Sequence, residues 1–170
     1  LNQDIPFGVS SKHFDHRDLE CMPLFDDRIY LIVPVNHPWA DYGRATPDDL
    51  LDQKIIMREE ISGTCETVLQ ALKAYSINVA MELGNPEAIE MAVERGVGIA
   101  FVSEMVAARG LAFGRVKKVE LQGLDLSRTV HMARHVHYPF TRAQNLFWDF
   151  ARSQHDKLNT EIWDSLVNFS

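Results

Sequence analysis

The sequence predicts an α/β fold, on three observations from residues 54–103. Strands and helices alternate there with short connections. Three helix starts each carry a small polar residue directly after a predicted strand. The run 97–102 is continuously apolar, which is typical of a strand buried on both faces of a sheet. Because helix N-termini that follow the strands of such a sheet converge on one crevice with unpaired N–H groups, this segment also predicts a small-molecule site.

Apolar runs predict three strands ahead of this segment, at residues 5–9, 19–25 and 28–34. Pro6 confines the first to a sheet edge or a strand start, because proline has no N–H to donate. Asp26 and Asp27 predict a turn between the second and the third. A loop is predicted next, at 36–43. Thr46-Pro47 then predicts a helix start, with Asp48 and Asp49 in the first turn.

The later elements follow from the spacing of apolar residues. Strands are predicted at residues 54–57, 77–82, 97–102, 115–121 and 128–133. Helical spacing predicts three helices and the faces that they bury: Val68, Leu69, Leu72 and Tyr75 in 64–75; Ile89, Ala92 and Val93 in 86–94; Ala143, Leu146, Phe147 and Phe150 in 141–154. Residues 104–109 predict a helix capped by Ser103, and 155–170 a tail helix.

Length and composition suit one ordinary domain or two small lobes: 170 residues, 46% hydrophobic and 24% charged. The net charge of −7 argues against nucleic-acid binding by this chain itself, since a phosphate-binding surface needs clustered Lys and Arg. Cys21 and Cys65 fit neither a disulfide framework nor a zinc motif and indicate a reducing compartment, so we expect a cytoplasmic protein. No apolar run predicts a signal peptide or a membrane span.

A series of motifs runs along the chain: 24–27 leading through 31–33 to His37-Pro38-Trp39-Ala40, then 62–64, then 93–103. In this order and at these intervals, they resemble the effector-binding domain of LysR-type transcriptional regulators. The likeness covers residues 4–153. Trp39 stands where the family usually has Leu, and Ser103 where it often has Pro.

The resemblance implies a two-lobed, periplasmic-binding-protein-like (type II) fold that holds a metabolite in the cleft between its lobes. Residues 1–48 are then expected in the first lobe, 49–127 in the second and 128–154 in a return to the first, with 155–170 as the tail helix. The family's sensor begins with two strand–helix units that precede the position of Asp4, so we expect an incomplete first lobe.

The resemblance also implies partners. The family carries a winged helix-turn-helix ahead of its sensor, and no such pattern occurs in these 170 residues, so DNA contact is expected only through a missing N-terminal domain. The family pairs its sensor domains side by side, so we expect a homo-oligomer. We expect no membrane partner.

The predicted effector site gathers residues at strand ends and helix starts. It comprises Ser10 and Ser11 in the first lobe and Met57, Arg58, Ser62, Gly63, Thr64, Asn85, Pro86, Val102 and Ser103 in the second. Arg58 is the candidate clamp for a carboxylate or oxyanion, and with the helix start at 62–64 it favours a small anionic metabolite.

Each of these residues has a simpler interpretation. Helix capping alone would account for Ser62 or Thr64, and equally for Asn85 and Ser103. Arg58 also suits an ion pair with a neighbouring glutamate, and the two serines of the first lobe suit an ordinary loop.

Catalysis and metal binding have less support. Cys65 at a helix start would need a histidine partner, and no histidine stands at a fixed spacing from it, so a buried apolar role fits better. His131 and His135 would lie ~13 Å apart along a strand, and His135 with His137 supplies only two ligands. We expect no catalytic residue, metal or cofactor.

The sequence therefore predicts a ligand-sensing regulatory domain without catalysis of its own. In the full protein, the effector would control DNA binding by changing how sensor domains pack. A solute-binding protein of the same cleft fold is the first alternative, which the lack of a signal peptide disfavours. A hydrolase that uses Cys65 is the second.

Overall fold

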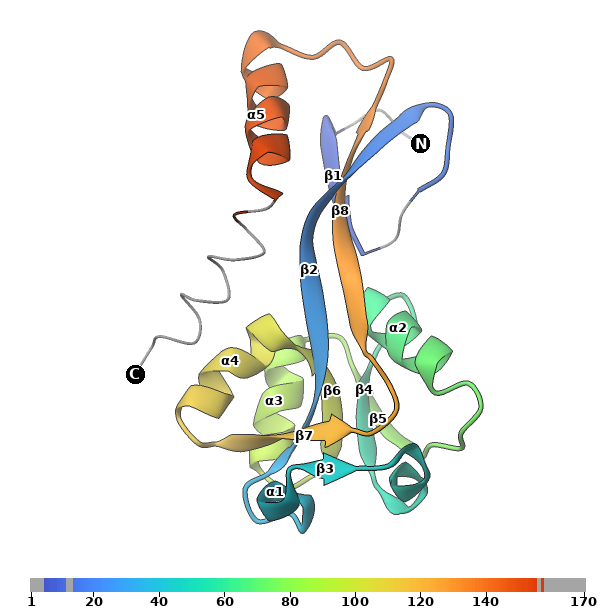
Figure 1. Cartoon of the computed structure of the whole chain (residues 1–170), viewed down its shortest axis with the longest axis vertical. Helices are drawn as coiled ribbons and strands as arrows, with labels where there is room; N and C mark the ends of the chain where they lie inside the picture. Colours follow the sequence, from blue (N-terminus) through green and yellow to red (C-terminus); the bar gives the residue numbers. More distant parts are fainter. Residues whose placement is uncertain (1–4, 12–13, 156, 158–170) are drawn as a thin grey trace. The chain divides into compact units, whose positions relative to one another are not determined.

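The computed structural model of the chain describes residues 5–11, 14–155 and 157 (Figure 1). Residues 158–170 of the predicted tail helix, with their apolar positions, lie outside the described residues. The chain divides into two compact units. Unit 1 contains the described residues up to Asp27 and from Arg128 onward, and unit 2 contains Arg28–Ser127.

One sheet of eight strands runs in the order β1-β8-β2-β6-β4-β5, with β7 paired to β2 and β3. The strands are β1 (Phe7–Ser10), β2 (Leu19–Pro34), β3 (Arg44–Ala45), β4 (Ile55–Arg58), β5 (Val79–Leu83), β6 (Ile99–Ser103), β7 (Val116–Leu121) and β8 (Ser127–His135). The helices are α1 (Trp39–Tyr42), the 3₁₀ helix η1 (Pro47–Asp52), α2 (Gly63–Ala71), α3 (Pro86–Glu94), α4 (Glu104–Ala112) and α5 (Arg142–Ser153). None of the described helices is long and apolar enough to cross a bilayer.

Unit 2 confirms the predicted α/β alternation. Strand β4 lies parallel to β5 and to β6, and each of the three is followed by a helix. Alternate side chains of the central strands enter two separate cores: Ile55 and Met57 pack with α2, whereas Ile56 packs with α3 and α4. The sheet is therefore covered on both faces, which explains the continuous apolar run of β6.

Two predictions about β2 were wrong. Residues 19–34 form one strand, and Asp26 and Asp27 lie within it rather than in a turn. The reason is long-range pairing: Asp27 binds Arg128 and Asp26 accepts a hydrogen bond from Thr129, both on β8. The two carboxylates that predicted a turn thus bind side chains of the strand β8.

The predicted lobe boundary after residue 48 also differs from the structure. Residues 28–48 belong to unit 2, because the second half of β2 pairs with β6 through Ile29–Ile32 and with β7 through Leu31–Pro34. The predicted loop at 36–43 contains the short helix α1, and the helix start at Thr46 opens the 3₁₀ helix η1 with a capping box to Asp49.

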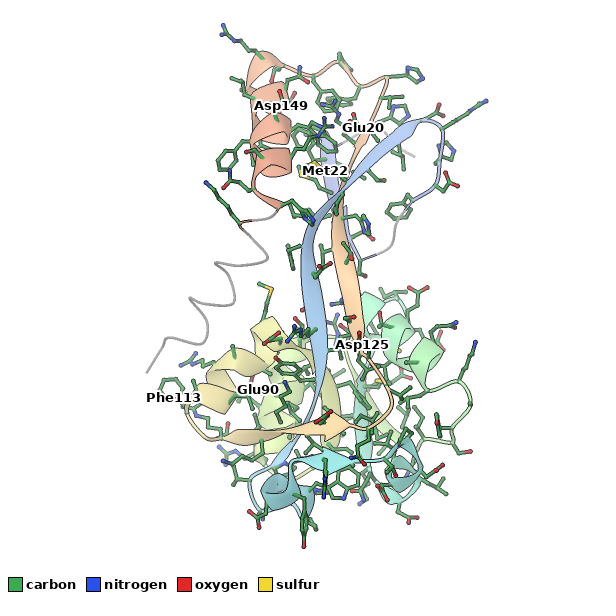
Figure 2. All side chains as sticks on the ribbon, in the orientation of Figure 1. Glu20, Met22, Glu90, Phe113, Asp125 and Asp149 are labelled. Carbon is green, nitrogen blue, oxygen red and sulfur yellow. The ribbon has the colours of Figure 1, made fainter. Side chains whose placement is uncertain are left out.

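Unit 1 has a small core of its own, made of Met22, Met132, Trp148 and Ala151 (Figure 2). The predicted inward face of α5 was wrong. Ala143 is exposed, and Leu146, Phe147 and Phe150 are 60%, 50% and 61% exposed.

The environment of Trp148 explains this orientation of α5. Its ring stacks on Phe7 with centroids 6.0 Å apart, and the guanidinium groups of Arg134 and Arg152 lie 4.4 and 5.8 Å from its centroid. Glu20 of β2 accepts hydrogen bonds from both arginines. Burial alone would raise the pKa of Glu20, but these two cations outweigh burial and lower it. Trp148 is therefore held against the sheet. Leu146 and Phe150 are left exposed, whereas Phe147 is half exposed, with its ring centroid 5.5 Å from that of Phe7.

The faces predicted for the other helices were partly right. In α2, Val68 is buried and Leu69 is exposed. Leu72, the C-cap of the helix, is buried, whereas Tyr75 lies beyond the end of the helix at Ala71 and is exposed. In α3, Ile89 and Val93 are buried as predicted.

Candidate functional site

Three helix N-termini lie along one edge of unit 2. Helices α2, α3 and α4 begin directly after β4, β5 and β6, which are parallel neighbours in the order β6-β4-β5. The first turn of each helix has backbone N–H groups without helical partners, which give the N-terminus a partial positive charge. This edge is therefore the part of unit 2 best suited to bind an anion.

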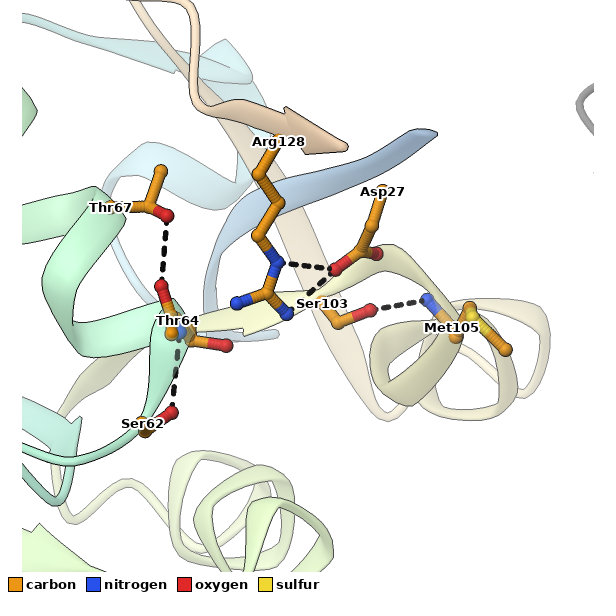
Figure 3. Close-up of polar contacts among 8 residues, drawn as sticks. Asp27, Ser62, Thr64, Thr67, Ser103, Met105 and Arg128 are labelled. Carbon is orange, nitrogen blue, oxygen red and sulfur yellow. Dashed lines mark hydrogen bonds and ion pairs between the residues drawn. The ribbon is translucent and has the colours of Figure 1, made fainter. Parts of the chain in front are cut away.

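Capping is confirmed at all three starts. The Ser62 and Ser103 hydroxyls accept hydrogen bonds from the backbone N–H groups of Thr64 and Met105, at 3.2 and 3.3 Å (Figure 3). Asn85 Oδ1 accepts one from Ala88 at 2.8 Å. Each cap satisfies one first-turn N–H, so the capping role leaves other first-turn donors for a ligand. A contact of these caps with an effector stays a prediction.

Arg58 ends β4, beside the start of α2. Its Nη2 donates a hydrogen bond to Glu59 Oε1 at 3.3 Å, which confirms the predicted neighbour pair. Its Nε is buried and has no hydrogen-bond partner among the described residues. The Glu59 carboxylate lies beside Gly84, where an added Cβ would meet Glu59 Oε2. The Nη2 atom of the guanidinium is thus bonded to Glu59, whereas its Nε donor has no partner among the described residues.

The remaining predicted residues lie in three kinds of place: in the cores of unit 2, at the first position of a helix, and in unit 1. Met57 and Val102 are each 1% exposed and belong to the two cores, so only their backbones are left for a ligand. Gly63 is the first residue of α2, and Pro86 is the first residue of α3. Ser10 and Ser11 belong to unit 1: Ser10 ends β1 opposite His131, and Ser11 follows it.

The start of α4 has an anchor that the sequence did not predict. Glu104, in its first turn, accepts a hydrogen bond from the Tyr30 hydroxyl of β2, and Lys118 Nζ lies 3.6 Å from the centroid of the Tyr30 ring. Burial and this hydrogen bond raise the pKa of Tyr30. Only the pairing of β2 with β6 and β7 brings these residues together, so local sequence patterns carry no signal for them.

Cys65 does not have the properties of a nucleophile. It is 3% exposed, and burial, with Glu82 and Glu60 nearby, raises the pKa of its thiol. A thiol with a raised pKa is mostly protonated at neutral pH, whereas nucleophilic cysteines have lowered values. Within the described residues, no group of three or more His, Cys, Asp and Glu side chains is arranged to hold a metal ion.

Comparison with known proteins agrees with this architecture. The LysR substrate binding domain family matches residues 1–156. The HTH-type transcriptional regulator MJ0300 of Methanocaldococcus jannaschii is 37% identical over 81% of this chain, and that match covers 48% of its own length. The HTH-type transcriptional regulator CbbR of Xanthobacter flavus is 34% identical over 74% of this chain and is covered over 42% of its length.

Among solved structures, the CcmR regulatory domain of Synechocystis PCC6803 in complex with 2-PG superposes with a TM-score of 0.83 at 23% identity. The match covers 94% of this chain and 77% of that one. The fold is therefore that of LysR regulatory domains, of the periplasmic-binding-protein-like type II. The chain belongs to the LysR substrate-binding domain family and is a LysR-type effector-binding domain. It spans about half the length of the curated relatives that it matches.

Proposed function

We propose that this chain is the sensing part of a LysR-type transcriptional regulator, and that it binds a small anionic metabolite at the carboxyl edge of the parallel strands in unit 2. The observation that carries the proposal is Arg58, with its buried and unpartnered Nε, beside three aligned helix N-termini. In the full protein, the metabolite would control DNA binding by a separate domain. The raised pKa and burial of Cys65 disfavour a hydrolase that uses this thiol, and the free thiols of Cys21 and Cys65 support a cytoplasmic location.

Simple magnitudes favour an anion. A charge-assisted hydrogen bond from a guanidinium contributes about 1.5–3 kcal/mol, and each helix N-terminus adds roughly 0.3–1 kcal/mol. Carboxylates at the same edge oppose this preference: Glu59, Glu60, Glu82 and Glu104. Of these, Glu59 is paired with Arg58, and Glu104 accepts a hydrogen bond from the Tyr30 hydroxyl. A neutral ligand could still accept a hydrogen bond from Arg58, but it would lack the attraction of a negative charge to the guanidinium and to the helix N-termini, so the site should discriminate by charge.

A ligand panel tests the proposal. Titration calorimetry with 2-PG, inorganic phosphate, sulfate and several small carboxylates is expected to give saturable binding for at least one anion. The matched control is the neutral amide or ester of the same compound, which should bind at least tenfold more weakly. Equal binding of the neutral analogue would contradict an anion site.

DNA binding by this chain alone is expected to be absent. The net charge is −7, and phosphate contacts need clustered cations. In an electrophoretic mobility assay at physiological salt, micromolar protein should leave the operator of the full-length regulator unshifted. A sequence-specific shift would overturn the assignment of this chain as a sensor without DNA-binding activity.

We also infer that the chain associates with a second copy through unit 1. Among the described residues, β1 pairs with β8 alone and no described strand covers its other edge, and α5 presents Leu146 and Phe150 to solvent. Both features are unfavourable in water, and a second copy would cover them. Sedimentation velocity at micromolar concentration should show a dimer.

Substitution of α5 tests that interface. The variant Phe150→Glu is expected to sediment as a monomer with an unchanged unfolding temperature, because Phe150 is 61% exposed. The control is Leu51→Glu, which places the same charge on an exposed leucine of unit 2. A wild-type chain that is monomeric at every concentration would refute this interface.

A further inference from the structure

Among the described residues, Asp27 is the one buried acid. Arg128 Nε and Nη2 both donate hydrogen bonds to Asp27 Oδ2, at 3.0 and 2.8 Å (Figure 3). The side chain of Asp27 is 3% exposed and that of Arg128 is 15% exposed. Because desolvation of two charges is costly, such a pair persists only where its geometry is good, and its main contribution is a defined geometry rather than stability.

The position of this pair in the chain is specific. Within the described residues, the chain passes between the units twice: from Asp27 to Arg28 on β2, and from Ser127 to Arg128 on β8. The ion pair therefore joins the last residue of unit 1 on one connecting strand to the first residue of unit 1 on the other.

Two further hydrogen bonds flank the pair, one between the same two strands and one from β2 to Leu126, the residue directly before β8. Asp26 Oδ1 accepts from the Thr129 hydroxyl at 2.8 Å, and Ile29 N donates to Leu126 O at 2.7 Å. Successive side chains of a strand point to opposite faces, so the Asp26 and Asp27 bonds lie on opposite faces of the strands. Side-chain bonds thus connect β2 and β8 on both faces of the two strands.

We propose that the Asp27–Arg128 ion pair is a hinge clamp that makes the two connecting strands bend as one. The two strands are already neighbours in the sheet, and the ion pair adds a side-chain contact to that pairing, so any reorientation of the units on effector binding would bend both strands together. The link to effector response rests on the proposed function, whereas the clamp itself does not.

Native-state amide exchange measured by NMR tests the clamp without any ligand. The first variant is Arg128→Lys, which keeps the charge but loses the two-point contact. The second is the apolar double variant Asp27→Leu, Arg128→Met, since replacement of a buried pair by apolar groups often leaves stability unchanged. In both, the Ile29 amide is expected to exchange at least tenfold faster.

Two internal controls distinguish a local clamp from a general loss of stability. The Ile99 amide, bonded to Lys54 O inside unit 2, should keep its protection in both variants. Thr129→Val removes only the exposed flanking bond and should change Ile29 exchange less than threefold. Unchanged exchange at Ile29, or an equal increase at Ile29 and Ile99, would overturn the proposal. Arg128→Lys decides the question if the double variant does not fold.

Discussion

Replacement of Gly98 by alanine is expected to destabilise the protein by about 3 kcal/mol, the upper part of the range for overpacked cores. Gly98 directly precedes β6, and a Cβ at this position would overlap the backbone oxygen of Lys54 and touch Ile56 Cγ1. That oxygen accepts the Ile99 N–H at 2.9 Å, so the methyl group would separate β4 from β6 where they pair. Backbone atoms in a sheet cannot move aside as a flexible side chain can.

Thermal unfolding measures this effect. A loss of about 3 kcal/mol corresponds to a decrease of roughly 6–12 °C in Tm for a chain of this length. The matched control is Gly8→Ala on the edge strand β1, where an added Cβ meets no atom within 4 Å. Its Tm should stay within about 2 °C of the wild type. Similar decreases in both variants would show that the approach of Gly98 to Lys54 is not the cause.

Removal of Arg58 is expected to weaken effector binding more than tenfold. Loss of a charge-assisted hydrogen bond of about 1.5–3 kcal/mol corresponds to roughly 10–150-fold in Kd. The Arg58→Ala variant should keep its fold, because the side chain is partly exposed and Glu59, its hydrogen-bond partner among the described residues, reaches solvent. Arg58→Lys should give an intermediate loss, since lysine keeps the charge without the planar fork.

Calorimetric titration with the tightest anion of the panel provides the measurement. Arg95→Ala is the matched control, because Arg95 is exposed and lies at the opposite end of α3 from its N-terminus. It removes the same charge from the same unit and should change Kd less than threefold. Unchanged affinity in Arg58→Ala would remove Arg58 from the site, and equal losses in both variants would indicate a general effect of net charge.

Local patterns in the sequence were sufficient for the elements that form the candidate site. Helices α2, α3 and α4 begin where their capping residues predict, because a cap involves atoms only two or three residues apart. The buried strand β6 was predicted from its continuous apolar run, although Val97 is exposed and the strand begins at Ile99. The family was recognised from motifs whose order and intervals are themselves properties of the sequence.

The tertiary structure decided what depends on residues far apart in the chain. Asp26 and Asp27 predict a turn by their type, but partners about one hundred residues away keep them inside a strand. The helical spacing of apolar residues alone assigns the wrong face of α5 to the core. The contacts that bury Trp148 instead come from Phe7 on β1 and Arg134 on β8. The sequence by itself therefore determined the helix starts and the fold class, through interactions that span a few residues. Only the folded chain determined the connecting strands and the orientation of α5, since charge pairing and packing act between neighbours in space.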